Sequence, residues 1–237
     1  MSKLKFIEKD HKYFKNGLEY NSVSKIIELV KPHFPANIIA SNVAKSQGVS
    51  KEEILHEWKT ARDMASQIGN DIHNALDQHS KNGVSKDLYW NDVARDIEKK
   101  LFSKYNTVDS EFMVHSDEHR VAGTVDRICY RNKNVIDIRD FKTNEKNGIV
   151  YEDKNKKFLS DPLSHLESTN YNTYALQLSI YGVLIEEMLN YKIGNLALIY
   201  IPPLNPMGWS YIPVPYMKKE AEALLGGCWG KVANNSN

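Results

Sequence analysis

Hydrophobic residues recur every three or four positions along residues 51–80, which predicts the longest amphipathic helix of the chain. A second, more polar helix is predicted over 86–105. A third is predicted over 171–190, where most positions are apolar, as expected for a helix packed inside the fold. The predicted buried positions of the first helix are Ile54, Trp58, Ala61, Ala65, Ile68, Ile72 and Ala75.

The N-terminal residues combine a turn signal with a capping signal. Apolar residues of the segment 4–21 flank Asn16-Gly17, a dipeptide that favours the type I′ turn of a β-hairpin. Ser22 then predicts the N-cap of a short helix that ends near Pro32. A further short helix is predicted over 36–46.

The second half of the chain reads mainly as strands. Three of them follow one another, and their connections are short enough for antiparallel hairpins. The predicted strands are 109–115, 120–130 and 134–142, followed later by 195–201 and 208–214. A polar surface loop is predicted at 144–168 and a last helix at 216–226.

The order helix, three strands, helix, strand predicts an α/β fold with a mixed sheet and helices on its faces. Helix 171–190 is expected to cross between a strand of the meander and the strand at 195–201. We expect one domain over 1–237. It comprises an N-terminal hairpin and helices (1–50), a core (51–201), and a C-terminal strand and helix (202–237).

Composition excludes several classes of protein. The chain has 237 residues, and its 31 Lys+Arg nearly balance its 30 Asp+Glu. No apolar run approaches the roughly 18 residues that a membrane span needs, and the N-terminus is charged, so we expect a cytoplasmic protein without a membrane partner. Cys129 and Cys228 are too few and too far apart for an iron–sulfur cluster. The sequence also contains no HExxH pair, the motif that would indicate zinc.

The predicted strand 134–142 ends in Asp140 and Lys142. Because side chains alternate along a strand, both lie on the face of Ile136 and Ile138. A charge on such a face is costly unless it is paired or bound to a metal, so one interpretation is a structural ion pair between Asp140 and Lys142. Asp137 and Arg139 would pair on the opposite face.

Asp126 lies on the preceding strand, on the face of Thr124 and Ile128. A hairpin can bring it beside Asp140, and two close, partly buried carboxylates repel unless a cation lies between them. Oxygen ligands without a thiolate favour Mg²⁺ or Mn²⁺. The alternative is that each carboxylate only accepts backbone hydrogen bonds.

Two helices add polar side chains. His73 lies one turn after Gly69, beside the apolar stripe, and is either a core histidine or a ligand. Gln177 and Tyr181 share one face of the helix 171–190 at a spacing of four residues. They either reach a phosphate or the Lys142 amine, or simply pack against each other.

Four motifs in this order resemble the RecB-type, exonuclease-like branch of the PD-(D/E)XK nuclease superfamily, especially its small stand-alone phage and bacterial members. The motifs are GxxxH (69–73), GTVDRI (123–128), DIRDFKT (137–143) and QLSIY (177–181). The resemblance covers roughly residues 51–201 and implies a restriction-endonuclease-like core. The chain departs from the pattern in having GTVD in place of a literal Pro-Asp.

The resemblance implies a role for each motif residue. Metal would be bound by His73, Asp126, Asp140 and the backbone carbonyl of Phe141, and Glu111 could hold a second ion. Lys142 would orient and polarise the attacking water, which makes it catalytic together with His73, Asp126 and Asp140. The implied DNA contacts are Gln177, Tyr181, Arg127 and Thr143.

The function so implied is a Mg²⁺- or Mn²⁺-dependent deoxyribonuclease with one or two ions. We expect an exonuclease acting on the ends of linear single- or double-stranded DNA in recombination, repair or phage DNA processing. It would work in a bacterial or phage-infected bacterial cell, with a recombination or annealing protein as a possible partner. The alternatives are an endonuclease, or a catalytically silent DNA-binding module with the same fold.

Overall fold

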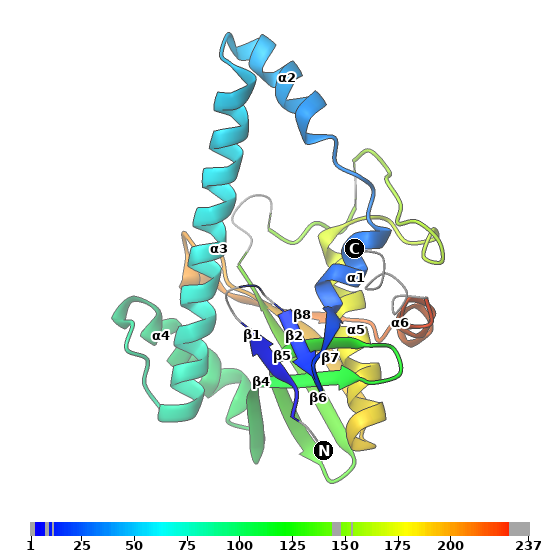
Figure 1. Ribbon diagram of the computed structural model, residues 1–237. Coiled ribbons are helices and arrows are strands. Elements are labelled where there is room, and N and C mark those ends of the chain that lie inside the picture. Colours follow the sequence, from blue (N-terminus) through cyan, green and yellow to red (C-terminus); the bar gives the residue numbers. More distant parts are fainter. Residues whose placement is uncertain (1–2, 8–9, 11, 144–147, 153, 228–237) are drawn as a thin grey trace.

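Eight strands form one mixed sheet in the order β1-β2-β3-β5-β6-β7-β8, and β4 pairs with β5 beside this path (Figure 1). The structure, a computed structural model, describes residues 3–7, 10, 12–143, 148–152 and 154–227. The strands are β1 (Lys5–Ile7), β2 (Lys12–Lys15), β3 (Leu18–Ser22), β4 (Thr107–Ser116), β5 (Val121–Asn132), β6 (Val135–Lys142), β7 (Lys192–Tyr200) and β8 (Ser210–Val214). The helices are α1 (Val23–Val30), α2 (Ala36–Gln47), α3 (Lys51–Asn82), α4 (Leu88–Ile97), a π-helical turn η2 (Glu98–Phe102), α5 (Asn170–Leu189), a 3₁₀ turn η3 (Pro206–Gly208) and α6 (Lys218–Leu225).

The predicted order of helix, three strands, helix and strand is confirmed. β4, β5 and β6 form an antiparallel meander. α5 then crosses over to β7, which pairs parallel to β6. The α/β mixed sheet with helices on its faces is therefore the fold of this chain.

Each face of the sheet has its own helices and its own core. Ile128, Ile136 and Ile138 pack with α1, α5 and α6 on one face. Cys129 and Phe141, which alternate with them along β5 and β6, pack with α3 and α4 on the other face. Figure 1 shows these two groups of helices on opposite sides of the central strands.

β5 is the strand on which the sheet divides. One of its edges pairs with β4 from Val121 to Tyr130. The other edge pairs with β3 at Val121 and Ala122, and with β6 only from Arg127 onward. The segment 123–126 therefore faces a gap between β3 and β6, and we call this gap the fork.

The N-terminal segment adds three strands to the sheet and leads into α1. Asn16 and Gly17 have φ angles of 51° and 76°, as the predicted type I′ turn requires. The Ser22 side chain accepts a hydrogen bond from the backbone N–H of Lys25, as expected for an N-cap. This cap fixes the start of α1 at the edge of the fork.

The predicted buried stripe along residues 51–80 is wrong in its middle part. Ile54, Ile72 and Ala75 are buried, but Ala61 is exposed. The reason is that α2 and the N-terminal half of α3 project away from the sheet (Figure 1). Near its start α3 packs against α2, around Ala40, Ala44 and Ile54, and Trp58 meets the ring of Phe34 just before α2.

The remaining expectations have mixed outcomes. In its described part, the predicted loop 144–168 contains one isolated β-bridge, between Phe158 and Glu167. No helix among the described residues is long and apolar enough to cross a membrane. Cys129 is buried and carries a free thiol, and Cys228 lies outside the described residues. The division of the chain into one domain with three parts stays a prediction.

Candidate metal centre

Asp126 lies in the fork, where β5 has no strand neighbour on one side. Its Oδ2 accepts a hydrogen bond of 2.7 Å from the backbone N–H of Phe141 on β6. A side chain thus takes over the pairing between β5 and β6 just beyond their last ladder pair, Arg127 and Arg139. Because the N–H and C=O of one strand residue point to the same side, the carbonyl of Phe141 also faces the fork.

Asp140 and Lys142 extend from the end of β6 on the same face. Their charged groups form an ion pair at 2.5 Å, so the predicted pairing of these two residues is confirmed. The Lys142 amine also donates a hydrogen bond of 3.0 Å to Oε1 of Gln177 on α5. It lies 4.5 Å from the centre of the Tyr174 ring, a cation–π distance. Three contacts therefore hold this amine.

Tyr181 continues the same row of contacts along α5. Its hydroxyl accepts a hydrogen bond of 3.1 Å from Nε2 of Gln177, as the four-residue spacing allows. The ring lies so close to β5 that a Cβ on Gly123 would come within 2.5 Å of it. Glycine in the GTVD motif is therefore needed for this contact between α5 and the fork.

His73 reaches the fork from α3. Its Nδ1 lies 3.4 Å from Oδ1 of Asp126, and its ring meets that of Phe141 edge to face at 5.8 Å between centres. α3 can approach this closely because Gly69, one turn earlier, leaves room for Thr143, whose Oγ1 would lie 3.2 Å from a Cβ there. His73 thus faces the carboxylates and is not a core histidine.

Glu111 faces Asp126 from β4. The ladder pairs Ser110 with Arg127 and Phe112 with Val125, which puts Glu111 across from Asp126. Its φ angle is 51°, in the left-handed region that non-glycine residues rarely adopt. Strain of this kind costs of order 1–3 kcal/mol and is often retained at functional sites.

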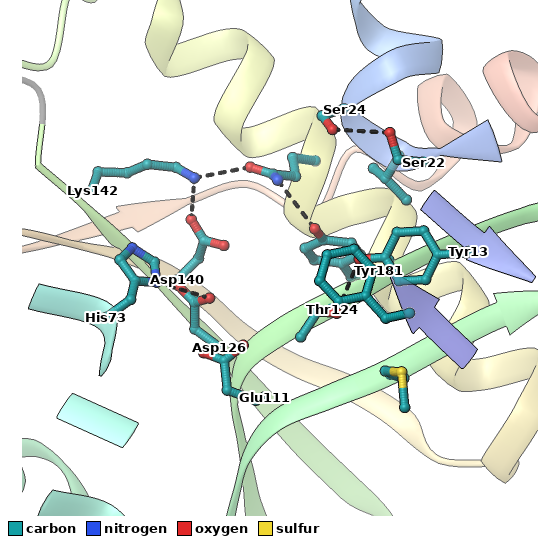
Figure 2. A pocket seen from close by; sticks show the side chains of 15 residues that line it. Tyr13, Ser22, Ser24, His73, Glu111, Thr124, Asp126, Asp140, Lys142 and Tyr181 are labelled. Atoms are coloured by element: carbon teal, nitrogen blue, oxygen red, sulfur yellow. Dashed lines mark hydrogen bonds and ion pairs between the residues drawn. The ribbon is translucent and has the colours of Figure 1, made fainter. Parts of the chain in front are cut away.

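These side chains line one pocket of about 480 Å³, a size typical of ligand sites. In Figure 2 the carboxylates, His73 and Lys142 gather at one end, and Tyr13 and Tyr181 lie toward the other. The lining residues are Phe6, Tyr13, Ser22, Val23, Ser24, His73, Glu111, Met113, Gly123, Thr124, Asp126, Asp140, Lys142, Gln177 and Tyr181.

The charges in the pocket shift one another's pKa. Burial, together with the neighbouring Asp126, raises the pKa of Glu111 to about 7 and that of Asp140 to about 6. Burial alone would lower the pKa of His73, but the carboxylates of Asp126 and Asp140 outweigh it and raise that pKa to about 9. Burial alone would also lower the pKa of Lys142, but Asp140 and Asp126 raise it. The positive charges of His73 and Lys142 thus offset part of the negative charge of the three carboxylates.

The pocket fits a divalent cation. One ligand atom each of His73, Glu111 and Asp126 can be chosen so that all three lie within 4.8 Å of one another. Asp140 lies beside them, and its buried Oδ2 is paired with the amine of Lys142. Carboxylate oxygens with one imidazole are a ligand set for Mg²⁺, Mn²⁺ and similar ions. This group could therefore hold a metal ion.

The structure brings most of the predicted site residues together. His73, Glu111, Asp126, Asp140, Lys142, Gln177 and Tyr181 all line the pocket. Phe141 contributes backbone atoms at the fork, while its side chain is buried against α3 and α4. Thr143 lies just beyond β6 against Gly69, outside the pocket lining.

Arg127 requires a correction. Its side chain has no exposed surface, so the prediction of a DNA contact is wrong. Strand alternation turns it to the face opposite Asp126, where it donates hydrogen bonds to the backbone carbonyls of Asp126 (2.9 Å) and Leu76 (2.7 Å). It also pairs with Glu98 at 3.1 Å. Arg127 therefore ties β5 to α3, the helix that carries His73.

Other residues at the site had no assigned role in the sequence. Tyr174, which contacts the Lys142 amine from outside the pocket lining, lies one turn before Gln177 on α5, so the helical spacing of three residues could have indicated it. Ser22 and Ser24 lie at the start of α1, with 3.1 Å between their hydroxyls. Met113 follows Glu111 by two residues on β4, so strand alternation places it on the same face. Phe6 comes from β1, and only the packing of the N-terminal strands brings it to the pocket.

Comparisons with known proteins give a limited picture. No family model matches this chain, and no curated protein matches it. The "Putative exonuclease" of Eubacterium rectale is a similar solved structure, with 11% identity, a TM-score of 0.40, and coverage of 88% of this chain and 78% of that one. SSO0001 is another, with 14% identity, a TM-score of 0.33, and coverage of 91% and 76%. Both TM-scores lie below 0.5, so the assignment of the site depends on its own geometry.

The raised pKa of Glu111 predicts how stability depends on pH. A carboxyl whose folded pKa is about 7, above its ordinary 4.5, stabilises the fold below pH 4.5 and loses that contribution as pH rises to 7. The side chain of Glu111 is partly exposed to solvent, which screens the repulsion, so we expect an effect of only about 1 kcal/mol. In EDTA at pH 8, Glu111→Gln should therefore melt about 2–4 °C above wild type, the shift that about 1 kcal/mol causes in a chain of this size. Equal melting temperatures at pH 8 would show that Glu111 is not held against Asp126.

The contacts of Arg127 predict a large loss of stability on truncation. Arg127→Met should lower the free energy of unfolding by about 3–5 kcal/mol, because it leaves the backbone carbonyls of Asp126 and Leu76 and the half-buried carboxylate of Glu98 without their donor. Arg95→Met is the control, since Arg95 forms an exposed pair with Asp92 and should cost less than about 1 kcal/mol. Urea unfolding measures both variants. A loss of under 1 kcal/mol for Arg127→Met would refute the role of Arg127 as a tie between β5 and α3.

Proposed function

We propose that this protein is a metal-dependent nuclease of the PD-(D/E)XK type, which hydrolyses DNA phosphodiester bonds. The observation that carries the proposal is the convergence at the fork. Asp126 lies in the middle of β5 where the fork opens, Asp140 lies near the end of β6, His73 approaches from α3, and the Lys142 amine lies between Asp140 and Gln177. Acids and an amine in contact on one pocket wall are the groups that phosphodiester hydrolysis uses.

The metal ligands would be His73, Asp126, Asp140 and the carbonyl of Phe141, with Glu111 holding a second ion through water. When bound, a Mg²⁺ or Mn²⁺ ion neutralises phosphate charge and lowers the pKa of water. His73 must give up its proton to act as a ligand, and its pKa of about 9 in the metal-free protein makes binding dependent on pH. Rising pH should favour metal binding, because the proton competes with the ion.

Lys142 supplies the other half of the chemistry. Its raised pKa keeps the amine protonated, so it acts as a hydrogen-bond donor and a positive charge, and not as a general base. Held by Gln177 and Tyr174, the amine can orient the attacking water and stabilise the negative charge that develops on the phosphate oxygens. Gln177 contacts this amine, and Tyr181 contacts Gln177 in turn, so the two would support the amine or position the DNA strand.

More specifically, we propose an exonuclease that acts at DNA ends in recombination, repair or phage DNA processing. An endonuclease uses the same chemistry and differs only in the DNA that reaches the pocket. A silent DNA-binding module is disfavoured by the strained backbone of Glu111, because strain of this kind is typically retained where a site uses it.

A cleavage assay tests the proposal. Linear DNA should be degraded with Mg²⁺ or Mn²⁺ and left intact in EDTA, and covalently closed circular DNA should resist if the protein is an exonuclease. Asp140→Asn and Lys142→Met should each reduce the rate by roughly 100- to 1000-fold or more, with the far-UV spectrum unchanged. Lys59→Met is the matched control. Lys59 also follows an acid by two residues but lies exposed on α3, paired with Asp63.

Three results would count against the proposal. Survival of every form of DNA with all metals would refute the nuclease function. Near-normal cleavage by Lys142→Met would leave a metal nuclease but exclude Lys142 as the amine that stabilises charge. A loss in Lys59→Met as large as in Lys142→Met would show that general surface charge, and not the fork, governs the rate.

A further inference from the structure

The pocket has a second half that the proposed chemistry does not use. Besides the carboxylates, apolar side chains from three separate elements line the pocket: Phe6 of β1, Val23 of α1 and Met113 of β4. Tyr13 of β2 also lines the pocket, and Figure 2 shows it across the pocket from His73 and Lys142. The acidic half and the apolar half thus face one continuous cavity.

The apolar half is braced by contacts that lie behind it. Phe6 and Tyr13 are paired across β1 and β2, and their ring centres lie 4.7 Å apart. The Tyr13 hydroxyl and Oγ1 of Thr124 on β5 lie 3.0 Å apart in a hydrogen bond, which fixes the aromatic pair to the fork. Tyr13 is only 3% exposed, whereas Phe6 and Met113 are half-buried and present surface to the cavity.

A ligand that fits both halves must carry a phosphate beside a flat apolar group. A nucleotide has both, since its phosphate and its base are joined by one sugar. We infer that an unpaired nucleobase next to the cleaved phosphate stacks on Phe6 and packs against Met113. This inference rests on the proposed nuclease function and names the form of DNA that the site accepts.

The stacking contact restricts the substrate. In a duplex each internal base is paired and is stacked on both faces, so none can lie against Phe6 without leaving the helix, which costs a few kcal/mol. A single strand or a frayed end offers an unpaired base without that cost. Stacking on an aromatic ring tolerates every base, so the pocket should accept single-stranded DNA without a sequence requirement.

Binding in EDTA, where metal-dependent cleavage cannot occur, tests the stacking contact. Phe6→Leu keeps an apolar side chain but removes the ring, and should weaken binding of a labelled single-stranded oligonucleotide by roughly 5- to 150-fold. Phe158→Leu makes the same substitution at an exposed phenylalanine outside the pocket and should bind as wild type does. Phe6→Trp restores a ring and should restore affinity, which a misfolded protein could not do.

Removing the base from the DNA gives the matching half of the experiment. A tetrahydrofuran abasic residue is moved along the oligonucleotide, and at one position it should weaken wild-type binding as much as Phe6→Leu does. In Phe6→Leu the same abasic residue should cause little further loss, because the two deletions remove one contact. No responsive position, or losses that simply multiply, would overturn the inference.

The cleavage assay separates this inference from the proposed function. With Mg²⁺, single-stranded ends should be cut faster than blunt duplex ends, and Phe6→Leu should reduce that preference. The base pocket would be refuted, and the nuclease left standing, by two results together. Both substrates would be cleaved at equal rates, and the losses of affinity from Phe6→Leu and from the abasic residue would simply multiply. Coupled losses in binding without cleavage of any DNA would refute the nuclease and leave the base pocket standing.

Discussion

The separation of β5 from β6 is the constraint on which the site depends. The two strands pair as far as Arg127 and Arg139, and beyond that point the hydrogen bond of Asp126 to the N–H of Phe141 replaces the ladder. Without this bond the amide of Phe141 would lie near the fork without its partner, at a cost of about 1–3 kcal/mol. The same bond fixes one carboxylate oxygen and leaves the other directed toward His73.

Buried charges behind the fork hold its two strands in place. On the face away from the pocket, Asp137 pairs with Arg139 at 3.4 Å, as expected from the sequence, and accepts a hydrogen bond of 2.7 Å from the Tyr105 hydroxyl. Arg127 makes the corresponding contacts behind β5. Charges are costly to bury, and here each of these arginines is satisfied in part by backbone carbonyls. The near-zero net charge of the chain thus hides two separate groups of paired charges, one structural and one lining the pocket.

Sequence patterns predicted the parts of the site that depend on local geometry. Strand alternation placed Asp126, Asp140 and Lys142 on one face, and helical spacing placed Gln177 beside Tyr181; both arrangements are present in the structure. The same alternation turned Arg127 away from Asp126, but its complete burial depends on how α3 and α4 pack. The left-handed backbone of Glu111 could not be predicted, because no turn residue marks it within the strand. The contribution of Phe6 could not be predicted either, because it depends on strands far apart in the sequence. The prediction of a buried stripe was wrong in the middle of α3, because the spacing of apolar residues does not show whether another element covers them.

The central claim is that the fork forms a metal centre, and manganese diffraction tests it most directly. Crystals of the protein are soaked in Mn²⁺, and anomalous data are collected at the manganese absorption edge. The account predicts an anomalous peak between His73, Asp126 and Asp140, with ligand distances of about 2.0–2.3 Å. A peak only at surface carboxylates, with the His73–Asp126 and Asp140–Lys142 pairs intact in saturating Mn²⁺, would contradict it.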